Sequence, residues 1–368
     1  MSGYLVTGAT GFVGGALTLE LLMTTDAPIH LLVRDTGTGA ERCRAALRAA
    51  AESYGFEPDF VSRQQDRLHI VAGDLRSGEF AEQLPGSEIS DVWHCAASLK
   101  FDDRSRDEIF AVNVDGTARL LDLSERLGVS RFNYMSTAYV TGTAAGTLTE
   151  TPVPADVCPN NQYEYSKAVA EDIVAKRDSM QTRIWRPSIV VGHSVTYAAT
   201  SFTGLYGFTR EGLRFKRRTE KVFGSNFVMR QRRIQADPAA EINLVPIDLL
   251  VRQAVSLSMR PGFDARIIHL TNKSAPTLHE ILSAASLLTG IPVPEYVDCT
   301  AGFTPIERRF QNTLRFYMPH VDRAKFFTQA VAEHYGSPID FPMDVDYLGS
   351  LLGWYIDHAG LADVDRVA

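Results

Sequence analysis

Cysteine is scarce in this 368-residue chain, and its four cysteines show no pairing pattern. No two of them form a C-x-x-C pair, and no spacing is typical of a metal site. We therefore expect neither a disulfide framework nor a bound metal ion, and we interpret the cysteines as small buried side chains in a reducing compartment. The four are Cys43, Cys95, Cys158 and Cys299.

Long apolar runs and an excess of positive charge are also absent. No apolar stretch approaches about 18 residues, so we expect no membrane-spanning helix. A strand pattern begins at about Tyr4, which leaves no room for a signal peptide and makes the cytoplasm the expected location. The formal net charge is −7, so nucleic acid is not an expected partner. With 45% hydrophobic and 22% charged residues, the composition indicates a soluble globular chain of one large or two smaller domains.

Three glycines separate a short apolar strand pattern at 4–6 from an apolar helical pattern. Gly8 permits a tight turn, Gly11 lets the backbone approach a diphosphate, and Gly14 lets the helix pack close to the strand. The helix start points its free N–H groups and positive dipole end at that diphosphate. A glycine-rich turn without a ligand is the alternative interpretation. The predicted dinucleotide contacts at this turn also include Thr10, Phe12 and Val13.

The end of the second predicted strand, 29–33, bears on which dinucleotide is bound. The residue about 20 positions after the glycines usually meets the adenosine ribose, where an acid favours a free 2′-hydroxyl and an arginine favours a 2′-phosphate. Arg34 and Asp35 both stand there, and Arg44 follows on a helix predicted over 40–53. We interpret Arg34 and Arg44 as contacts to NADP. The alternative is that the arginines form a solvated helix face.

Further strand ends supply the remaining candidates for dinucleotide contacts. Strands are predicted over 68–71, 92–97, 132–135 and 184–187, and a long helix over about 107–127. This alternation predicts an α/β fold with a doubly wound, Rossmann-type parallel sheet and with ligand at the carboxyl edges of its strands. An acid at such an edge suits the adenine amino group, and small residues let a cofactor pass over it. The candidates there are Asp74, Leu75, Ala96, Ala97 and Pro187, and Asn113 on the long helix is a further candidate.

A hydroxyl, a phenol and an amine form the candidate catalytic set. Thr137 follows the fifth predicted strand, so its hydroxyl faces the cleft. Tyr163 and Lys167 stand one turn apart on one face of a predicted helix. A tyrosine that donates a proton near neutral pH needs its pKa lowered from about 10, and a nearby ammonium favours the phenolate. An ordinary amphipathic helix is the alternative interpretation of this pair.

The second half of the chain differs in composition from the first. The stretch 202–233 is rich in Arg and Lys within an acidic protein, and Arg214, Arg217 and Arg218 are its candidate docking residues. We interpret the stretch as a site for phosphate or an acidic partner, and the alternative is a solvated surface.

Two domains are predicted. Residues 1–192 form an NADP-binding Rossmann domain to which 240–272 return. Residues 193–239 and 273–368 form a smaller, mostly helical substrate-binding region, in which Thr277 begins a capping box.

Taken together, the motifs resemble the extended short-chain dehydrogenases/reductases. The matching residues, in family order, are 7–14, Gly73-Asp74, 94–97, 113–117, Ser136-Thr137, Tyr163-x-x-x-Lys167 and Arg186-Pro187. The variants at 32–34, 94–97 and 136–140 are most similar to the thioester reductase branch. That branch comprises the terminal reductase domains of peptide and polyketide synthases, carboxylic acid reductases and fatty acyl-CoA reductases. The chain carries no synthetase modules, so we expect a stand-alone member.

The resemblance implies a reaction and a role for each candidate. Thr137 would hydrogen-bond the substrate carbonyl, Tyr163 would donate a proton to its oxygen, and Lys167 would hold the nicotinamide ribose. Asn113 would support this network. The implied activity is NADPH-dependent reduction of an acyl thioester to an aldehyde, with the alcohol as the product of a second round. The implied partner is coenzyme A or an acyl or peptidyl carrier protein, docked by the basic stretch.

Other activities on the same scaffold remain open at this point. A nucleotide-sugar epimerase or dehydratase would hold NAD tightly, and a reductase of a small ketone or sterol would not need a thioester. An NADP-sensing regulatory module would be expected to lack the catalytic tyrosine. The oligomeric state is open as well.

Overall fold

A seven-stranded parallel sheet forms the centre of the protein, as the strand–helix alternation predicts. The computed structural model describes residues 3–34, 37–77, 84, 88–154, 158–224, 232–314 and 324–361. Neighbouring strands of the sheet all run parallel, in the order β11-β7-β5-β4-β1-β2-β3. The strands are β1 (Gly3–Thr7), β2 (Ile29–Val33), β3 (Leu68–Ala72), β4 (Ile89–His94), β5 (Arg131–Met135), β7 (Gln181–Pro187) and β11 (Ile267–Leu270).

The direction of the strand order reverses between β1 and β4. At such a switch point the connections from the two strands leave toward opposite faces, which opens a crevice at the carboxyl edge. The glycine turn follows β1, and Ala96-Ala97 follow β4, so the two predicted contact regions flank this crevice. The fold thereby places them side by side although they are far apart in the sequence.

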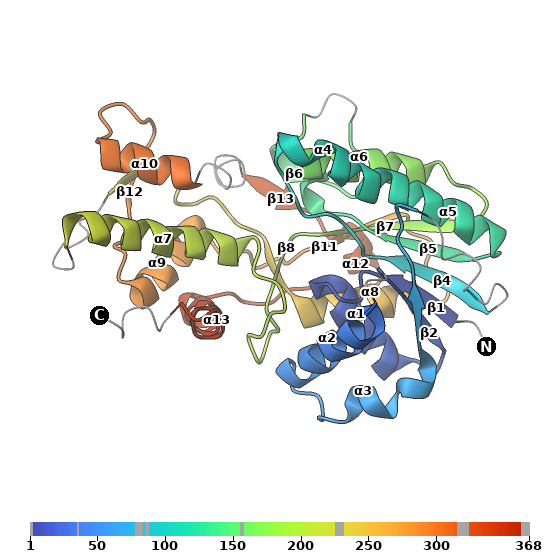
Figure 1. Cartoon of the computed structure of the whole chain (residues 1–368). Coiled ribbons are helices and arrows are strands. Elements are labelled where there is room, and N and C mark those ends of the chain that lie inside the picture. The colour runs from blue at the N-terminus through green and yellow to red at the C-terminus, as the bar shows by residue number, and fades with distance from the viewer. Residues whose placement is uncertain are drawn as a thin grey trace.

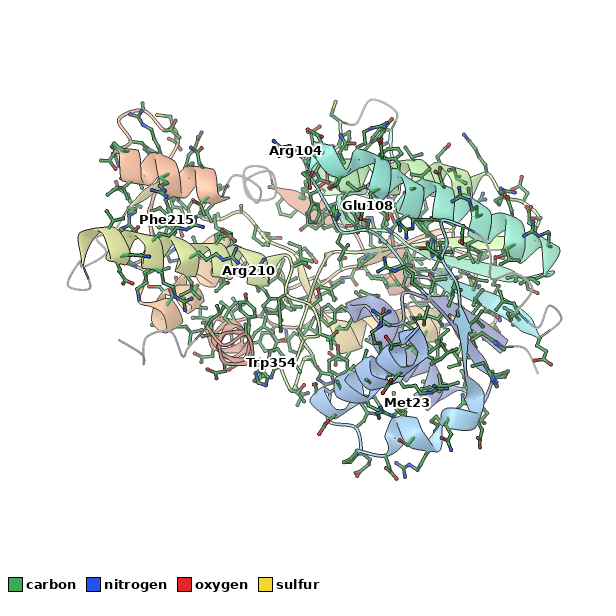
Figure 2. The ribbon with its side chains drawn as sticks, in the orientation of Figure 1. Met23, Arg104, Glu108, Arg210, Phe215 and Trp354 are labelled. Carbon is green, nitrogen blue, oxygen red and sulfur yellow. The ribbon has the colours of Figure 1, made fainter. Side chains whose placement is uncertain are left out.

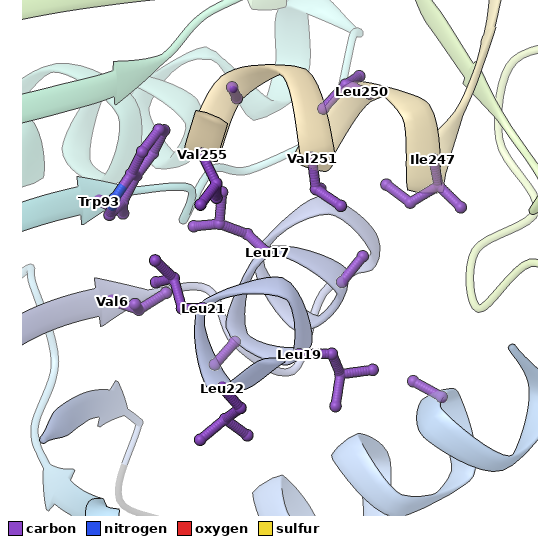
Figure 3. Packing of buried hydrophobic residues seen from close by; sticks show 14 of the residues in the cluster. Val6, Leu17, Leu19, Leu21, Leu22, Trp93, Ile247, Leu250, Val251 and Val255 are labelled. Carbon is purple, nitrogen blue, oxygen red and sulfur yellow. The ribbon is translucent and has the colours of Figure 1, made fainter. Parts of the chain in front are cut away.

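Helices cover both faces of the sheet (Figure 1). One face carries α1 (Phe12–Thr24), α2 (Gly39–Ser53), α3 (Phe60–Arg63) and α8 (Ile247–Met259), and the other carries α4 (Arg106–Phe110), α5 (Gly116–Arg126) and α6 (Gln162–Ala175). Figure 3 shows leucines of α1 packed against α8, with Val6 of β1 and Trp93 of β4 beside them. Each leucine removed from water in this way contributes about 1.5–3 kcal/mol.

The helix predicted over 107–127 is interrupted by a π-helical turn, Ala111–Asp115, between α4 and α5. This turn contains Asn113, whose side chain accepts from the backbone N–H of Ser98 and donates to the carbonyl of Ser98 and the hydroxyl of Ser166. Widened turns of this kind are frequent at functional sites. Here the turn directs Asn113 toward the loop after β4 and toward α6.

A helical lobe, which we define as α7 (Leu205–Phe223), α9 (Leu278–Thr289), α10 (Pro305–Leu314) and α13 (Val345–His358), lies to one side of the sheet (Figure 1). Its own apolar core includes Tyr206, Leu351 and Tyr355. The predicted capping box of Thr277 and Glu280 begins α9. Strands β9 (Arg233–Gln235) and β12 (Glu295–Val297) pair within this lobe, and β8 (Ile189–Val191) pairs with β10 (Leu244–Pro246) next to it.

Part of the C-terminal region returns to the sheet. Strand β13 (Lys325–Phe327) pairs with β6 (Gly146–Leu148), and α12 (Ala330–His334) packs against β11. Glu150 fixes this return because its carboxylate accepts from the N–H groups of His269 and Val331. The predicted assignment of all of 273–368 to a substrate region does not anticipate these contacts. The domain boundaries themselves stay a prediction.

Two of the four cysteines are exposed, so the interpretation of all four as buried side chains is wrong. Cys43 is buried and Cys95 is half-buried, but Cys158 and Cys299 stand in surface loops before α6 and after β12. All four are free thiols. Among the described residues, no helix combines the length and apolar character needed to cross a membrane.

Candidate active site

A cavity of about 700 Å³ follows the carboxyl edge of the sheet from β3 to β7 and continues to the helical lobe. It brings together most of the residues singled out in the sequence. These are Gly8, Thr10, Gly11, Phe12, Val13, Gly14, Arg34, Asp74, Leu75, Ala96, Ala97, Thr137, Tyr163, Lys167 and Pro187.

The glycine turn leaves no room for side chains. Gly8 has φ of +77°, and a Cβ there would lie 2.7 Å from the backbone nitrogen of Ala96. A Cβ on Gly14 would lie 2.3 Å from the carbonyl oxygen of Gly8. Helix α1 begins directly after Gly11 with no side-chain cap. Its first N–H groups are therefore free to bind an anion in the cavity.

The adenosine end of the cavity differs in part from the prediction. Arg34 lines it, but Arg44 does not, since Arg44 stands on an exposed face of α2. Arg76, which the sequence reasoning missed, lines the cavity and forms a two-pronged ion pair with Asp74. This pairing lowers the pKa of the Asp74 carboxyl. Asp35 lies outside the described residues.

A buried histidine, His94, holds the carboxyl end of β4 in place, where a dinucleotide would cross the edge of the sheet. The Nδ1 of His94 lies 2.7 Å from the Thr7 hydroxyl, and its Nε2 lies 2.9 Å from the Thr117 hydroxyl. The Thr117 hydroxyl donates to the carbonyl of Asn113, so it accepts from His94, which places the imidazole proton on Nε2. Burial lowers the pKa of His94 to about 3, so the ring is neutral. The Thr7 oxygen also accepts from the N–H of Ala96, which holds the strand end in place.

Helix α6 presents the catalytic candidates Tyr163 and Lys167 to the cavity. Asn161 caps the helix by accepting from the N–H of Glu164. The ammonium of Lys167 donates to the carbonyl of Met135 at 2.8 Å and lies 4.6 Å from the centre of the Tyr134 ring. Lys167 is therefore fixed between α6 and the end of β5.

Thr137 extends from the end of β5 beside them. Its oxygen accepts from the N–H of Tyr139 at 3.3 Å, at the start of a 3₁₀ turn over Ala138–Thr141. The hydroxyl proton is thus free to point into the cavity. The Tyr163 ring packs edge-on against Phe101, with ring centres 5.4 Å apart. The structure therefore brings all three catalytic candidates to the lining of one cavity.

The expectation that Lys167 lowers the pKa of Tyr163 is not met. Burial raises the pKa of the phenol well above 10, and the charge of Glu164 raises it further. The Lys167 ammonium lies 6.0 Å from the centre of the Tyr163 ring, and burial lowers its own pKa to about 8. Desolvation thus outweighs the attraction between ammonium and phenolate. Tyr163 is a neutral phenol near pH 7 and can donate a hydrogen bond.

Asn113, one of the predicted dinucleotide contacts, is not among the residues that line the cavity and lies behind it. Its amide joins the loop after β4 to Ser166 of α6, whose hydroxyl donates to the carbonyl of Tyr163. This agrees with the predicted supporting role, which stays a prediction.

Two further hydroxyls line the cavity: Ser136 belongs to the predicted Ser136-Thr137 motif, whereas Ser188 is not among the residues predicted from the sequence. The side chains of Ser136 and Ser188 are buried and line the cavity, and neither hydroxyl has a partner among the described residues. Buried polar atoms of this kind are costly unless a ligand or water satisfies them. Ser188 directly follows the strand predicted over 184–187, and this is the signal that would have found it.

The far end of the cavity is apolar. Side chains from the region between β8 and α9 line it, and none of the described lining residues there is charged. The apolar ones are Ile189, Val190, Leu205, Phe208, Ile242, Leu244, Leu278 and Ile281.

The predicted docking arginines lie on α7. Arg214 pairs with Glu211, and Arg217 donates to the carbonyl of Leu361. Arg218 is exposed on the same helix, on which Figure 2 also labels Arg210. Two of the three candidates therefore already have intramolecular partners.

The residues present fit a nicotinamide dinucleotide. The tight glycine turn and uncapped helix suit a diphosphate, Arg34 and Arg76 suit the adenosine end, and the unpaired hydroxyls suit polar groups at the other end. Among the described residues, no group of three or more His, Cys, Asp or Glu side chains is arranged to hold a metal ion.

Comparison with known proteins gives the family. Residues 6–254 match the family model described as male sterility protein. A linear gramicidin synthase of Brevibacillus parabrevis is 26% identical over 292 residues, which cover 76% of this chain and 5% of that protein. Fatty acyl-CoA reductase 1 of Gallus gallus is 27% identical over 225 residues, covering 50% and 42%. UDP-glucose 4-epimerase of Vibrio cholerae is 29% identical over 218 residues, covering 57% of each chain.

The chain spans less than two thirds of the length of each of these relatives. Among solved structures, the terminal R domain from the myxalamid PKS-NRPS biosynthetic pathway has a TM-score of 0.75 at 23% identity, covering 98% of this chain and 91% of that one. The predicted fold and the resemblance to thioester reductases are thereby confirmed. The chain belongs to the NAD-binding male sterility family of oxidoreductases, on the extended short-chain dehydrogenase/reductase fold.

Proposed function

We propose that the protein is an NADPH-dependent reductase that converts an acyl thioester, carried on coenzyme A or a carrier protein, to an aldehyde. A second round would give the alcohol. The observation that carries this proposal is the continuity of the cavity. It joins the glycine turn, the wall of Thr137, Tyr163 and Lys167, and the uncharged apolar end in the helical lobe.

Cofactor binding would rest on the residues already described. The N–H groups at the start of α1 would hold the diphosphate. Arg34 and Arg76 are the cations at the adenosine end, which favours a 2′-phosphate over a free hydroxyl. When bound, NADPH would supply hydride to the thioester carbonyl carbon. Arg44 does not line the cavity and is not one of these contacts.

Thr137 and Tyr163 would stabilise the carbonyl oxygen. The Thr137 oxygen already accepts from the N–H of Tyr139, so its proton is available for the substrate. Tyr163 donates a second hydrogen bond as negative charge develops on that oxygen, an interaction strongest in the transition state. Its high pKa does not prevent the transfer of its proton, because an alkoxide is more basic than a phenolate. Lys167 would hold the ribose and offset the charge of the phenolate.

The chemistry of the thioester then differs from that of a ketone. Proton transfer from Tyr163 to the oxygen gives a hemithioacetal. When this hydroxyl returns its proton to the Tyr163 phenolate, the carbonyl re-forms and the carbon–sulfur bond breaks. The departing sulfur then takes the proton from Tyr163, so the products are an aldehyde and a free thiol. A small ketone has no such leaving group and would stop at the alcohol. Product analysis therefore separates the two kinds of reductase.

A nucleotide-sugar epimerase or dehydratase is the main alternative, because a UDP-glucose 4-epimerase is among the relatives. A nucleoside diphosphate carries two negative charges and needs positively charged partners. The described lining of the cavity at its far end offers hydroxyls, aliphatic groups and the Phe208 ring but no cation. This favours an apolar acyl group there. The presence of Tyr163 in the cavity argues against a purely NADP-sensing module.

We further propose that cations on α7 dock the carrier. Arg214 and Arg218 are exposed, whereas Arg217 donates to the carbonyl of Leu361 at the C-terminal end of the described chain. Charge reversal at Arg218 should raise KM for a carrier-protein thioester and leave KM for a pantetheine thioester unchanged. If the variant and the wild type have the same KM for the carrier-protein thioester, Arg218 does not dock the carrier.

The experiment that tests the function is a screen of NADPH oxidation against acyl thioesters, free aldehydes and UDP-sugars, with product analysis. We expect oxidation with thioesters and release of thiol. A protein that retains NAD through purification and converts UDP-sugars without net oxidation would refute the proposal.

A further inference from the structure

Lys325 is a buried lysine that the proposed mechanism does not use. It stands at the start of β13, only 4% exposed, in the part of the C-terminal region that returns to the sheet. Its ammonium donates to the carbonyls of Gly142 and Ala144 at 2.6 and 2.5 Å. Burying a lysine is costly, so a residue held in this way calls for a reason.

The two carbonyls belong to the loop that follows Thr137. The 3₁₀ turn over Ala138–Thr141 leads directly into this loop, and Gly142 adopts φ of +52° there. A Cβ on Gly142 would lie 2.1 Å from the carbonyl of Cys158, so the loop is also pressed against the segment before α6. Lys325 thus ties the Thr137 loop to a strand from the other half of the chain.

Lys325 also acts on a charge beside Tyr163. Glu164 is 2% exposed, lines the cavity and accepts from the backbone N–H of Asn160 as part of the cap of α6. Burial raises the pKa of the Glu164 carboxyl, and the bonds from Asn160 and the charge of Lys325 offset part of this rise. Burial likewise raises the pKa of Tyr163, and the charge of Glu164 raises it further. Among the described residues, Tyr139 also faces Glu164, and burial raises the pKa of its phenol.

These contacts have one consequence for the proposed reaction. As Tyr163 gives up its proton, negative charge grows next to an existing buried carboxylate, and a cation nearby reduces the repulsion. Lys325 does not line the cavity and so does not reach the substrate. From these contacts we propose that Lys325 is a positioning residue, which fixes the Thr137 loop and balances the charge of Glu164 beside Tyr163.

This inference rests on the proposed function for its kinetic test. Lys325→Met should lower kcat by roughly 10- to 100-fold, since a small misplacement of catalytic groups has effects of this size. The dissociation constant of NADPH should stay within about twofold, because Lys325 lies outside the cavity. Lys325→Arg, which keeps the charge and the donors, should recover most of the activity. Lys273→Met is the matched control, because Lys273 pairs with Glu333 of the same returning segment at the surface.

The double variant separates charge from scaffolding. Glu164→Gln keeps the helix cap, since Gln serves in capping boxes, but removes the carboxylate charge. Lys325→Met with Glu164→Gln should therefore be more active than Lys325→Met alone. A purely structural lysine would give no such recovery, and that result would overturn the proposal, as would full activity of Lys325→Met.

Two readouts do not depend on turnover. Amide hydrogen exchange over 138–146 should be faster in Lys325→Met than in the wild type and in Lys325→Arg. The pKa of Glu164, followed by carbon NMR and assigned by its loss in Glu164→Gln, should rise in Lys325→Met. If the wild type reduces no thioester, the proposed function fails, but these readouts still decide the role of Lys325. Unchanged exchange together with an unchanged Glu164 pKa would refute it.

Discussion

Gly14→Ala offers a sharp test of the dinucleotide turn, because helix propensity and packing predict opposite effects. Gly14 lies within α1, where alanine is favoured over glycine by about 1 kcal/mol. A Cβ there would lie 2.3 Å from the Gly8 carbonyl oxygen, whereas real Cβ atoms hardly ever approach closer than 3.0 Å. The turn and the helix would have to separate by roughly 0.7 Å, and overpacking of this kind costs about 1–3 kcal/mol.

The same shift would move the N–H groups that bind the diphosphate. We expect NADPH affinity to fall by at least about tenfold, equal to about 1.4 kcal/mol, measured by isothermal titration calorimetry. Gly349→Ala is the control, since Gly349 also lies within a helix but has open space at its Cβ position. It should raise the melting temperature slightly and leave NADPH binding unchanged. Wild-type affinity in a folded Gly14→Ala variant would refute the assignment of this turn.

Three further predictions concern charged groups. Arg34→Ala and Arg76→Ala should each lower the preference for NADPH over NADH by roughly tenfold, measured as the ratio of the two Kd values. Arg44→Ala should leave this ratio unchanged. An effect confined to Arg44→Ala would contradict the placement of the 2′-phosphate. Arg186→Met should lower the free energy of unfolding by about 3–5 kcal/mol in urea, because it leaves Glu171 buried without its partner. Arg177→Met, which removes a surface ion pair, should lower it by at most about 1 kcal/mol. A loss in Arg186→Met as small as that in Arg177→Met would contradict the importance of the buried pair. Burial lowers the pKa of Lys167 from 10.5 to about 8, so the unfolded chain binds more protons between these values and stability gains a contribution as pH rises through them. The difference in unfolding free energy between the wild type and Lys167→Met should therefore grow by about 3 kcal/mol from pH 7 to 10.5, and a constant difference would contradict the buried position.

The sheet and most of the cavity could be predicted because each depends on local pattern. Apolar runs followed by Gly, Asp or Thr mark strands and their carboxyl ends, and the fold rule then brings those ends together. Features that depend on packing could not be predicted in this way. The face of α2 on which Arg44 stands is one example, and the pairing of Arg76 with Asp74 is another.

The extent of burial is the other property that the sequence pattern does not give. The spacing of Tyr163 and Lys167 indicates proximity, but the sequence does not show how completely both are desolvated, and desolvation decides the direction of their pKa shifts. The return of β13 to the sheet also has no local signal. A three-residue strand such as Lys325–Phe327 is defined by its partner β6, far earlier in the chain.

The central claim is that Tyr163 donates the proton to the substrate oxygen. The most direct measurement compares kcat and the NADPH dissociation constant of Tyr163→Phe with those of Tyr165→Phe, a neighbour on α6 that is 41% exposed. We predict that Tyr163→Phe lowers kcat by about 10²–10⁴-fold with NADPH binding nearly intact, and that Tyr165→Phe changes neither. Turnover by Tyr163→Phe at the wild-type rate would contradict the account.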